Sequence, residues 1–218
     1  MRSLCPRGLG AALLLAITAC AAPVAPQALR PATPVIVLVQ RFADPLAAVV
    51  GAAAALRAGQ DRYQLQARVP DSGSVTAQAG LVMAAIAAHA RALVVDPVDY
   101  AALLPALRAA HDAAIPVVVT GVAPDTANTS FVVSFVAAPG AAPSGVATDG
   151  PALTLVSAGR LATAVGPRAC DLVRAAVGQA VAAANNDGPG VHGFVPVPVA
   201  TATTASLRAQ GLAGWSHC

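Results

Sequence analysis

Strand-like and helix-like segments alternate between residues 35 and 137, and this alternation constrains the fold more than any other feature. The first strand-like segment, VIVLV at 35–39, is apolar on both faces, as a strand buried in a parallel sheet must be. Further strands are predicted at 63–69, 92–95, 115–120 and 131–136. Helices are predicted between the first four strands, at residues 44–58, 74–90 and 99–113.

Strands that alternate with helices over short connections form a parallel sheet with right-handed crossovers and helices on both faces. We therefore expect an α/β fold, a doubly wound sheet of strand order 2-1-3-4-5. This single main lobe would occupy residues 35–137, the size of one small domain. Asp44 and Pro45 are predicted to open the first helix, as its N-cap and its first helical residue.

The periodic pattern weakens after residue 137. Residues 138–151 are rich in Ala, Gly and Pro and are typical of a linker. A short strand is predicted at 152–156, then a helix at 158–184 that breaks at Gly166-Pro167. Two prolines restrict residues 191–200 to an edge strand or an irregular segment. The last twenty residues carry no clear signal.

The first nineteen residues are typical of a signal peptide. Arg2 and Arg7 precede an apolar run at 9–19, which is shorter than the roughly 20 residues that cross a membrane. The run ends in small residues followed by Cys20, which resembles the bacterial lipobox and implies lipidation of Cys20. Residues 20–34 would then tether the domain to the extracytoplasmic face of the cell membrane. A secretory peptide with an incidental Cys20, or an uncleaved anchor, are the alternatives.

Composition excludes several classes of function. All 13 basic residues are Arg and all 10 acidic residues are Asp, so no mechanism can use a catalytic Lys or Glu. The net charge of +3 comes from scattered arginines without a basic run, which argues against nucleic acid. No nucleophile motif, phosphate-binding loop or metal-ligand spacing is present, so we expect no enzyme, no cofactor and no metal. Cys170 and Cys218 are expected to be free or loosely paired.

Candidate ligand-binding residues follow from the strand order. Ligands of doubly wound sheets bind at the carboxyl ends of the strands where the strand order reverses, here between the first and third strands. An Arg fork, carboxylates and an aromatic face suit a small polyol or amino-sugar-like solute. The candidates are Arg41, Phe42 and Asp44 after the first strand, Asp96 and Asp99 after the third, and Thr120 at the end of the fourth.

Structural roles remain open for three of these candidates. Asp44 and Asp99 each precede a predicted helix, where an Asp side chain commonly caps the first turn. Arg41 lies three residues before Asp44, so the two side chains can form a surface ion pair instead of contacting a ligand.

Residues 35–121 resemble the N-terminal lobe of type I periplasmic solute-binding proteins, the ribose-binding and LacI-like sugar-receptor group. The resemblance rests on VIVLVQRFADPL, on a strand that ends in Asp96-Pro97-Val98-Asp99, and on the IPVVVTG segment at 115–121. SAGRLATAV at 157–165 and VHGFVPVPVATATT at 191–204 are similar to later parts of that family. The resemblance implies a solute-binding component of an ABC transporter, with a sugar as solute and a permease as partner.

Departures from the family pattern open two alternatives. The stacking aromatics and the Asp-Arg pair of the family are replaced here by Leu46-Ala47 and Thr120-Gly121. Residues 166–190 hold one helix rather than a second α/β lobe, so residues 138–218 are interpreted as a linker plus a remnant of that lobe. The alternatives are an interaction or structural module without a ligand, which includes a homodimer, and a decayed truncated receptor.

Overall fold

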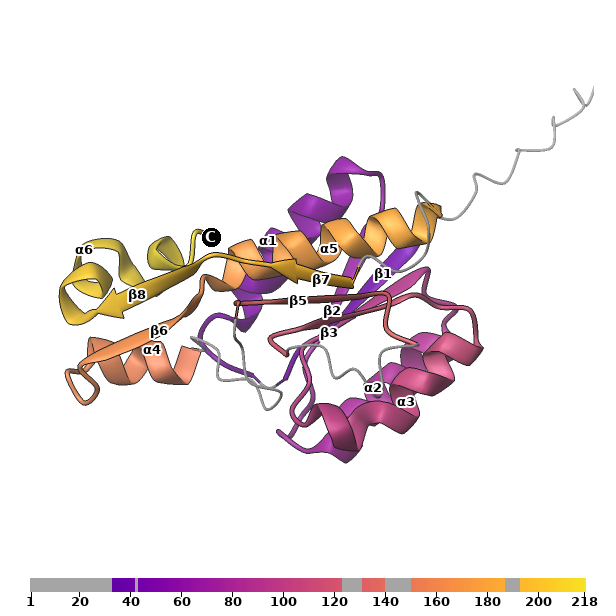
Figure 1. Ribbon diagram of the computed structural model, residues 1–218, viewed down its shortest axis with the longest axis horizontal. Helices are drawn as coiled ribbons and strands as arrows, with labels where there is room; N and C mark the ends of the chain where they lie inside the picture. Colours follow the sequence, from indigo (N-terminus) through magenta and orange to yellow (C-terminus); the bar gives the residue numbers. More distant parts are fainter. Residues whose placement is uncertain (1–32, 42, 123–130, 140–149, 187–192) are drawn as a thin grey trace, which may run out of the picture. The chain divides into compact units, whose positions relative to one another are not determined.

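The computed structural model describes residues 33–41, 43–122, 131–139, 150–186 and 193–218. Its main element is a six-stranded sheet in which all neighbouring strands run parallel (Figure 1). The order is β2-β1-β3-β4-β5-β7, so the predicted order 2-1-3-4-5 is confirmed and β7 extends the sheet beyond β5. The strands are β1 Val35–Val39, β2 Gln64–Arg68, β3 Ala92–Val95, β4 Val117–Thr120, β5 Ser134–Ala137 and β7 Gly193–Pro196.

Helices cover both faces of this sheet, which explains why β1 is apolar on both sides. Val37 and Val39 pack against the helices α2 (Val75–Ala87) and α3 (Tyr100–Asp112). Ile36 and Leu38 point the other way, toward α1 (Ala47–Gln60) and α5 (Ala169–Asn185). Figure 1 shows α1 with α5, and α2 with α3, on opposite sides of the strands. The predicted doubly wound α/β architecture is therefore confirmed.

Two late elements join the lobe that the sequence placed at 35–137. The helix α5 completes the cover over β3, β4 and β5, and β7 pairs with β5 from Ser134↔Gly193 to Ala137↔Pro196. The helix predicted at 158–184 is in fact two elements, the strand β6 (Thr163–Pro167) and then α5. The change occurs at Gly166-Pro167, where the sequence predicted a break.

A small unit is formed by two segments of the chain, one that precedes α5 and one that follows β7. It contains α4 (Gly150–Ser157), β8 (Val199–Thr203), which pairs antiparallel with β6, and α6 (Thr204–Trp215). The strand predicted at 152–156 is wrong, because Leu153 and Val156 lie three residues apart on the buried side of α4. Both side chains pack with Trp215 in the core of the unit.

The C-terminus is fastened to the start of α5. Cys170 and Cys218 form a disulfide with 5.3 Å between their Cα atoms, so the prediction of free or loosely paired thiols is wrong. The last twenty residues carried no clear signal in the sequence, but their end contacts α5. The Cys170 amide donates to the Ser216 carbonyl, and Arg174 donates to the His217 carbonyl.

The disulfide is expected to supply a large share of the stability of the chain. Its cysteines are 48 residues apart, and closing a loop of that length is worth about 4 kcal/mol in the chain-entropy model. We expect the double variant Cys170→Ala/Cys218→Ala to lose most of this free energy of unfolding in a urea titration. Trp215, the single tryptophan, is 1% exposed and reports the opening of the small unit by fluorescence.

A His217→Ala variant is the control for this prediction, because it removes side-chain contacts of the same terminus and leaves the disulfide in place. These contacts are exposed and should contribute little. An unchanged urea midpoint in the double variant would show that the disulfide does not stabilise the fold.

Candidate functional site

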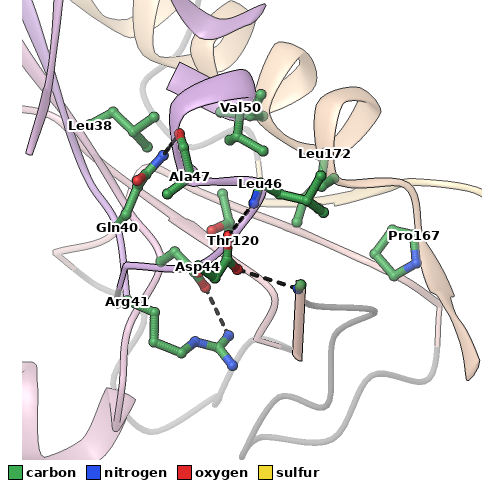
Figure 2. Close-up of a pocket in the computed structure, with 14 residues that line it drawn as sticks. Leu38, Gln40, Arg41, Asp44, Leu46, Ala47, Val50, Thr120, Pro167 and Leu172 are labelled. Atoms are coloured by element: carbon green, nitrogen blue, oxygen red, sulfur yellow. Dashed lines mark hydrogen bonds and ion pairs between the residues drawn. The ribbon is translucent and has the colours of Figure 1, made fainter. Parts of the chain in front are cut away.

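A pocket lies at the carboxyl edge of the sheet, where the strand order reverses between β1 and β3. Its floor comes from the ends of β1, β3 and β4, and its walls come from the first residues of α1, α4 and α5 (Figure 2). The cavity volume is about 90 Å³. One water molecule needs roughly 10–15 Å³, so the pocket has room for a small solute. Its polar side chains are those of Gln40, Arg41, Asp44, Asp96 and Thr120.

An ion pair spans the point where β1 and β3 end. Arg41 Nη2 lies 2.8 Å from Asp96 Oδ1, and the two side chains are 13% and 34% exposed. Arg41 therefore pairs with Asp96 rather than with Asp44, because β1 and β3 are neighbours and their carboxyl ends lie side by side. The buried Nε of Arg41 has no hydrogen-bond partner among the described residues. The ion pair therefore joins the ends of the two strands at the pocket.

Asp44 holds two helix starts in place rather than capping α1 directly. Its Oδ1 accepts from the Leu46 amide at 2.7 Å, and its Oδ2 accepts from the Gly150 amide of α4 at 3.3 Å (Figure 2). The predicted helix start is wrong by two residues, since α1 begins at Ala47 with Leu46 as N-cap. Pro45 and Leu46 form a turn instead. Asp44 therefore ties the main lobe to the small unit at the pocket.

Gln78 is a buried residue of the site that the sequence analysis missed. It is fully buried on α2, and its Nε2 donates to the carbonyls of Gln40 (3.1 Å) and Asp96 (2.7 Å). Its Oε1 accepts from the Val98 amide at 2.9 Å. One side chain thereby satisfies the backbone at the ends of both β1 and β3. The available signal was an amide side chain on a predicted helix in which most other residues are Ala or aliphatic.

Gln40 is a second buried polar residue at the pocket. Its Nε2 donates to the Ala47 carbonyl at 2.9 Å (Figure 2), while its Oε1 has no hydrogen-bond partner among the described residues. The side chain is placed by β1 on one side and by the first residue of α1 on the other.

The remaining candidates have different outcomes. Thr120 lines the pocket, and its hydroxyl donates to the Val95 carbonyl at 3.4 Å. Asp99 is not among the lining residues, and its side chain accepts from the Ala102 amide at 3.0 Å as the N-cap of α3. The alternative role as a helix cap is thus confirmed for Asp99. Phe42 and Cys20 lie outside the described residues.

The opposite wall of the pocket is aliphatic, and the sequence analysis missed it entirely. It includes Leu172 and Val173 from α5 and Pro167 from the end of β6. These residues follow Asp44 by more than 120 positions, and only the return of the chain through α5 brings them to the site. No periodic signal links such distant segments.

Within the described ranges, no group of three His, Cys, Asp or Glu side chains is placed to hold a metal ion. None of the helices that the structure describes is both long enough and apolar enough to span a lipid bilayer.

Gly150 is a tight contact point that tests the role of Asp44. A Cβ atom on Gly150 would lie 2.9 Å from Asp44 Cγ, so either α4 or Asp44 must move to admit it. We expect Gly150→Ala to lower the free energy of unfolding by about 1–3 kcal/mol, the usual cost of overpacking. Urea titration measures this change.

Gly80→Ala is the matched control, because Gly80 lies inside α2 with nothing within 4 Å of its added Cβ. Replacing Gly by Ala in an open helical position stabilises by roughly 0.5–1 kcal/mol. If both variants shifted the midpoint in the same direction, Gly150 would not be a packing constraint.

Comparisons with known proteins agree with this architecture. Residues 35–142 match the family model of the periplasmic binding protein domain. An ABC transporter solute-binding protein from Agrobacterium vitis, with bound D-fucose, superposes with TM-score 0.65 at 13% identity, over 79% of this chain and 96% of that one. One from Mycobacterium smegmatis, with bound glycerol, gives TM-score 0.61 at 16% identity, over 82% and 96%.

A third similar structure is an ABC transporter solute-binding protein from Bacillus halodurans C-125 with bound myo-inositol. It gives TM-score 0.61 at 13% identity, over 81% of this chain and 96% of that one. At these identities the likeness concerns the fold. Among proteins of curated function, no sequence matches this chain significantly.

Proposed function

We propose that the chain is a solute-binding protein of the periplasmic binding protein family, whose domain model matches residues 35–142. The observation that carries the proposal is the Arg41–Asp96 ion pair in a pocket at the strand-order reversal. Ligands of doubly wound sheets bind at this position. The pair offers a planar donor and a carboxylate acceptor to a neutral polar solute.

A small polyhydroxy compound is the solute class that the polar groups favour. A hydroxyl group both donates and accepts, and the Arg41–Asp96 pair presents guanidinium donors and a carboxylate acceptor to it. The similar solved structures hold D-fucose, glycerol and myo-inositol, all of which are polyols or sugars. We assign ligand contact to Arg41, Asp96 and Thr120, with Asp44 and Gln78 holding the backbone of the site.

The partners follow from the same proposal. The protein would deliver its solute to an ABC permease, as the transport role implied by the resemblance requires. Lipidation of Cys20 would hold it at the extracytoplasmic face of the cell membrane, with residues 20–34 as the tether. The Cys170–Cys218 disulfide supports this location, because disulfides persist in oxidising compartments outside the cytoplasm.

Thermal unfolding with glycerol, D-fucose and myo-inositol tests solute binding. A ligand at about 100 times its Kd adds roughly 2.7 kcal/mol, which raises the Tm by several degrees. We expect at least one of these solutes to give such a shift in the wild-type protein. We expect Arg41→Ala to abolish the shift measured against the variant's own ligand-free Tm.

Arg57→Ala is the matched control, because Arg57 also belongs to an ion pair but faces solvent on α1, where it pairs with Asp61. The solute shift should be unchanged in this variant. A shift that survives Arg41→Ala would place the site elsewhere. No shift with any solute, in a protein that unfolds cooperatively, would overturn the proposal and favour an interaction module.

Cell fractionation tests the membrane anchor. We expect the wild-type protein in the membrane fraction and the Cys20→Ser variant in the soluble extracytoplasmic fraction, because the variant has no thiol to lipidate. A Cys5→Ser variant is the control, since Cys5 lies inside the predicted signal peptide. Equal distribution of the Cys20→Ser and wild-type proteins would rule out lipidation at this residue.

A further inference from the structure

The pocket presents two chemically different sides. The polar side chains come from the ends of β1, β3 and β4, together with Asp44. The facing wall is built by Leu46 and Val50 at the start of α1 and by Leu172 and Val173 at the start of α5. None of the described lining residues carries an aromatic ring. A solute in this pocket therefore meets hydrogen-bonding groups on one side and aliphatic carbon on the other.

Most groups on the polar side already have a partner within the protein. Both carboxylate oxygens of Asp44 accept backbone amides, Asp96 is paired with Arg41, and the Thr120 hydroxyl donates to the Val95 carbonyl. The Arg41 guanidinium carries five N–H donors and gives one hydrogen bond to Asp96, so it can anchor the hydroxyl end of a solute. A hydroxyl group at the other end of the solute would need a partner on the aliphatic wall.

That wall cannot provide such partners. Leu46 and Val173 are 3% and 4% exposed, so a hydroxyl pressed against them loses its water and gains no hydrogen bond. A methyl group at the same place removes apolar surface from water and is favoured. The difference between one hydroxyl and one methyl group therefore decides how well a solute fits this side of the pocket.

We propose that the site selects solutes with hydroxyl groups at one end and a methyl group at the other, such as deoxy sugars and short alkyl diols, over their fully hydroxylated counterparts. This inference rests on the proposed function, since it names the solute class of the same pocket. The aliphatic wall acts as the specificity determinant, and the polar edge provides the common anchor.

Isothermal titration of the purified protein with matched pairs of solutes tests the inference. D-fucose differs from D-galactose by a methyl group in place of a hydroxymethyl group, and 1,2-propanediol differs from glycerol in the same way. We expect a Kd at least ten-fold lower for D-fucose than for D-galactose, or for 1,2-propanediol than for glycerol. Equal or tighter binding of the hydroxylated members would overturn the inference and leave the proposed function intact.

Absence of binding by all four solutes would overturn the proposed function and, with it, this inference. The two failures are therefore distinguishable in one experiment. Wild-type protein alone suffices for this part of the test, so the result does not depend on the folding of any variant.

A change in the wall should alter the preference. Leu172→Asn gives the extra hydroxyl group a hydrogen-bond partner and is expected to reduce the ten-fold preference to less than three-fold. Leu56→Asn is the matched control, because Leu56 on α1 is 74% exposed and is not among the lining residues. Val50→Thr, which keeps the shape of the side chain, is the second wall variant. An unchanged preference in both wall variants would overturn the assignment of specificity to this wall.

Discussion

A parallel sheet whose strands are apolar on both sides is stable only when helices cover both of its faces. Here α2 and α3 follow their strands directly and cover one face. The second face needs α5, which lies some 130 residues after β1 and packs over β3, β4 and β5. The chain therefore has to return to the sheet after the small unit is built. This return places the start of α5 at the carboxyl edge of β1, where it becomes a wall of the pocket.

The same requirement explains the position of the C-terminus. Since α5 begins at the pocket, its first turn lies at the carboxyl edge of the sheet, where another part of the chain has to cover it. The last residues of the chain, from Trp215 onward, cover this turn through the Cys170–Cys218 disulfide, the Cys170–Ser216 backbone bond and the contact of the Arg168 guanidinium with the Trp215 ring. The start of α5 thus determines how the sheet is covered, how the pocket is shaped and where the C-terminus is anchored.

Local sequence patterns were sufficient to predict β1 to β5 and the three helices between them. VIVLV and ALVV are continuous apolar runs, and Ser74 and Asp99 are N-caps in the structure as their chemistry suggests. Patterns were insufficient where an element is defined by distant contacts. The strand β6 was read as part of a helix, because its short TAVGP segment becomes a strand only by pairing with β8. The Asp44 side chain was read as a cap for α1, because its second partner, Gly150, lies 106 residues later.

The residues of the candidate site also fall into those that local patterns predict and those that distant contacts define. Arg41, Asp44, Asp96 and Thr120 were found from the rule that ligands meet the carboxyl ends of strands, and all four line the pocket. Gln78 and the aliphatic wall were missed because they act through tertiary contacts, one from the interior of α2 and the other from α5. The sequence thus predicted the polar side of the pocket, which belongs to consecutive βα units. It did not predict the aliphatic side, which forms only when the chain returns to the sheet through α5.

The junction between β7 and β8 has an evolutionary consequence. Only Val197 and Pro198 separate the strand that completes the large sheet from the strand that enters the small one, and only Arg168 separates β6 from α5. Two of the connections of the small unit are therefore only one or two residues long, and none of its residues interrupts a strand of the six-stranded sheet. Such an arrangement lets insertions or deletions change the size of the small unit while the scaffold that holds the pocket floor is inherited unchanged.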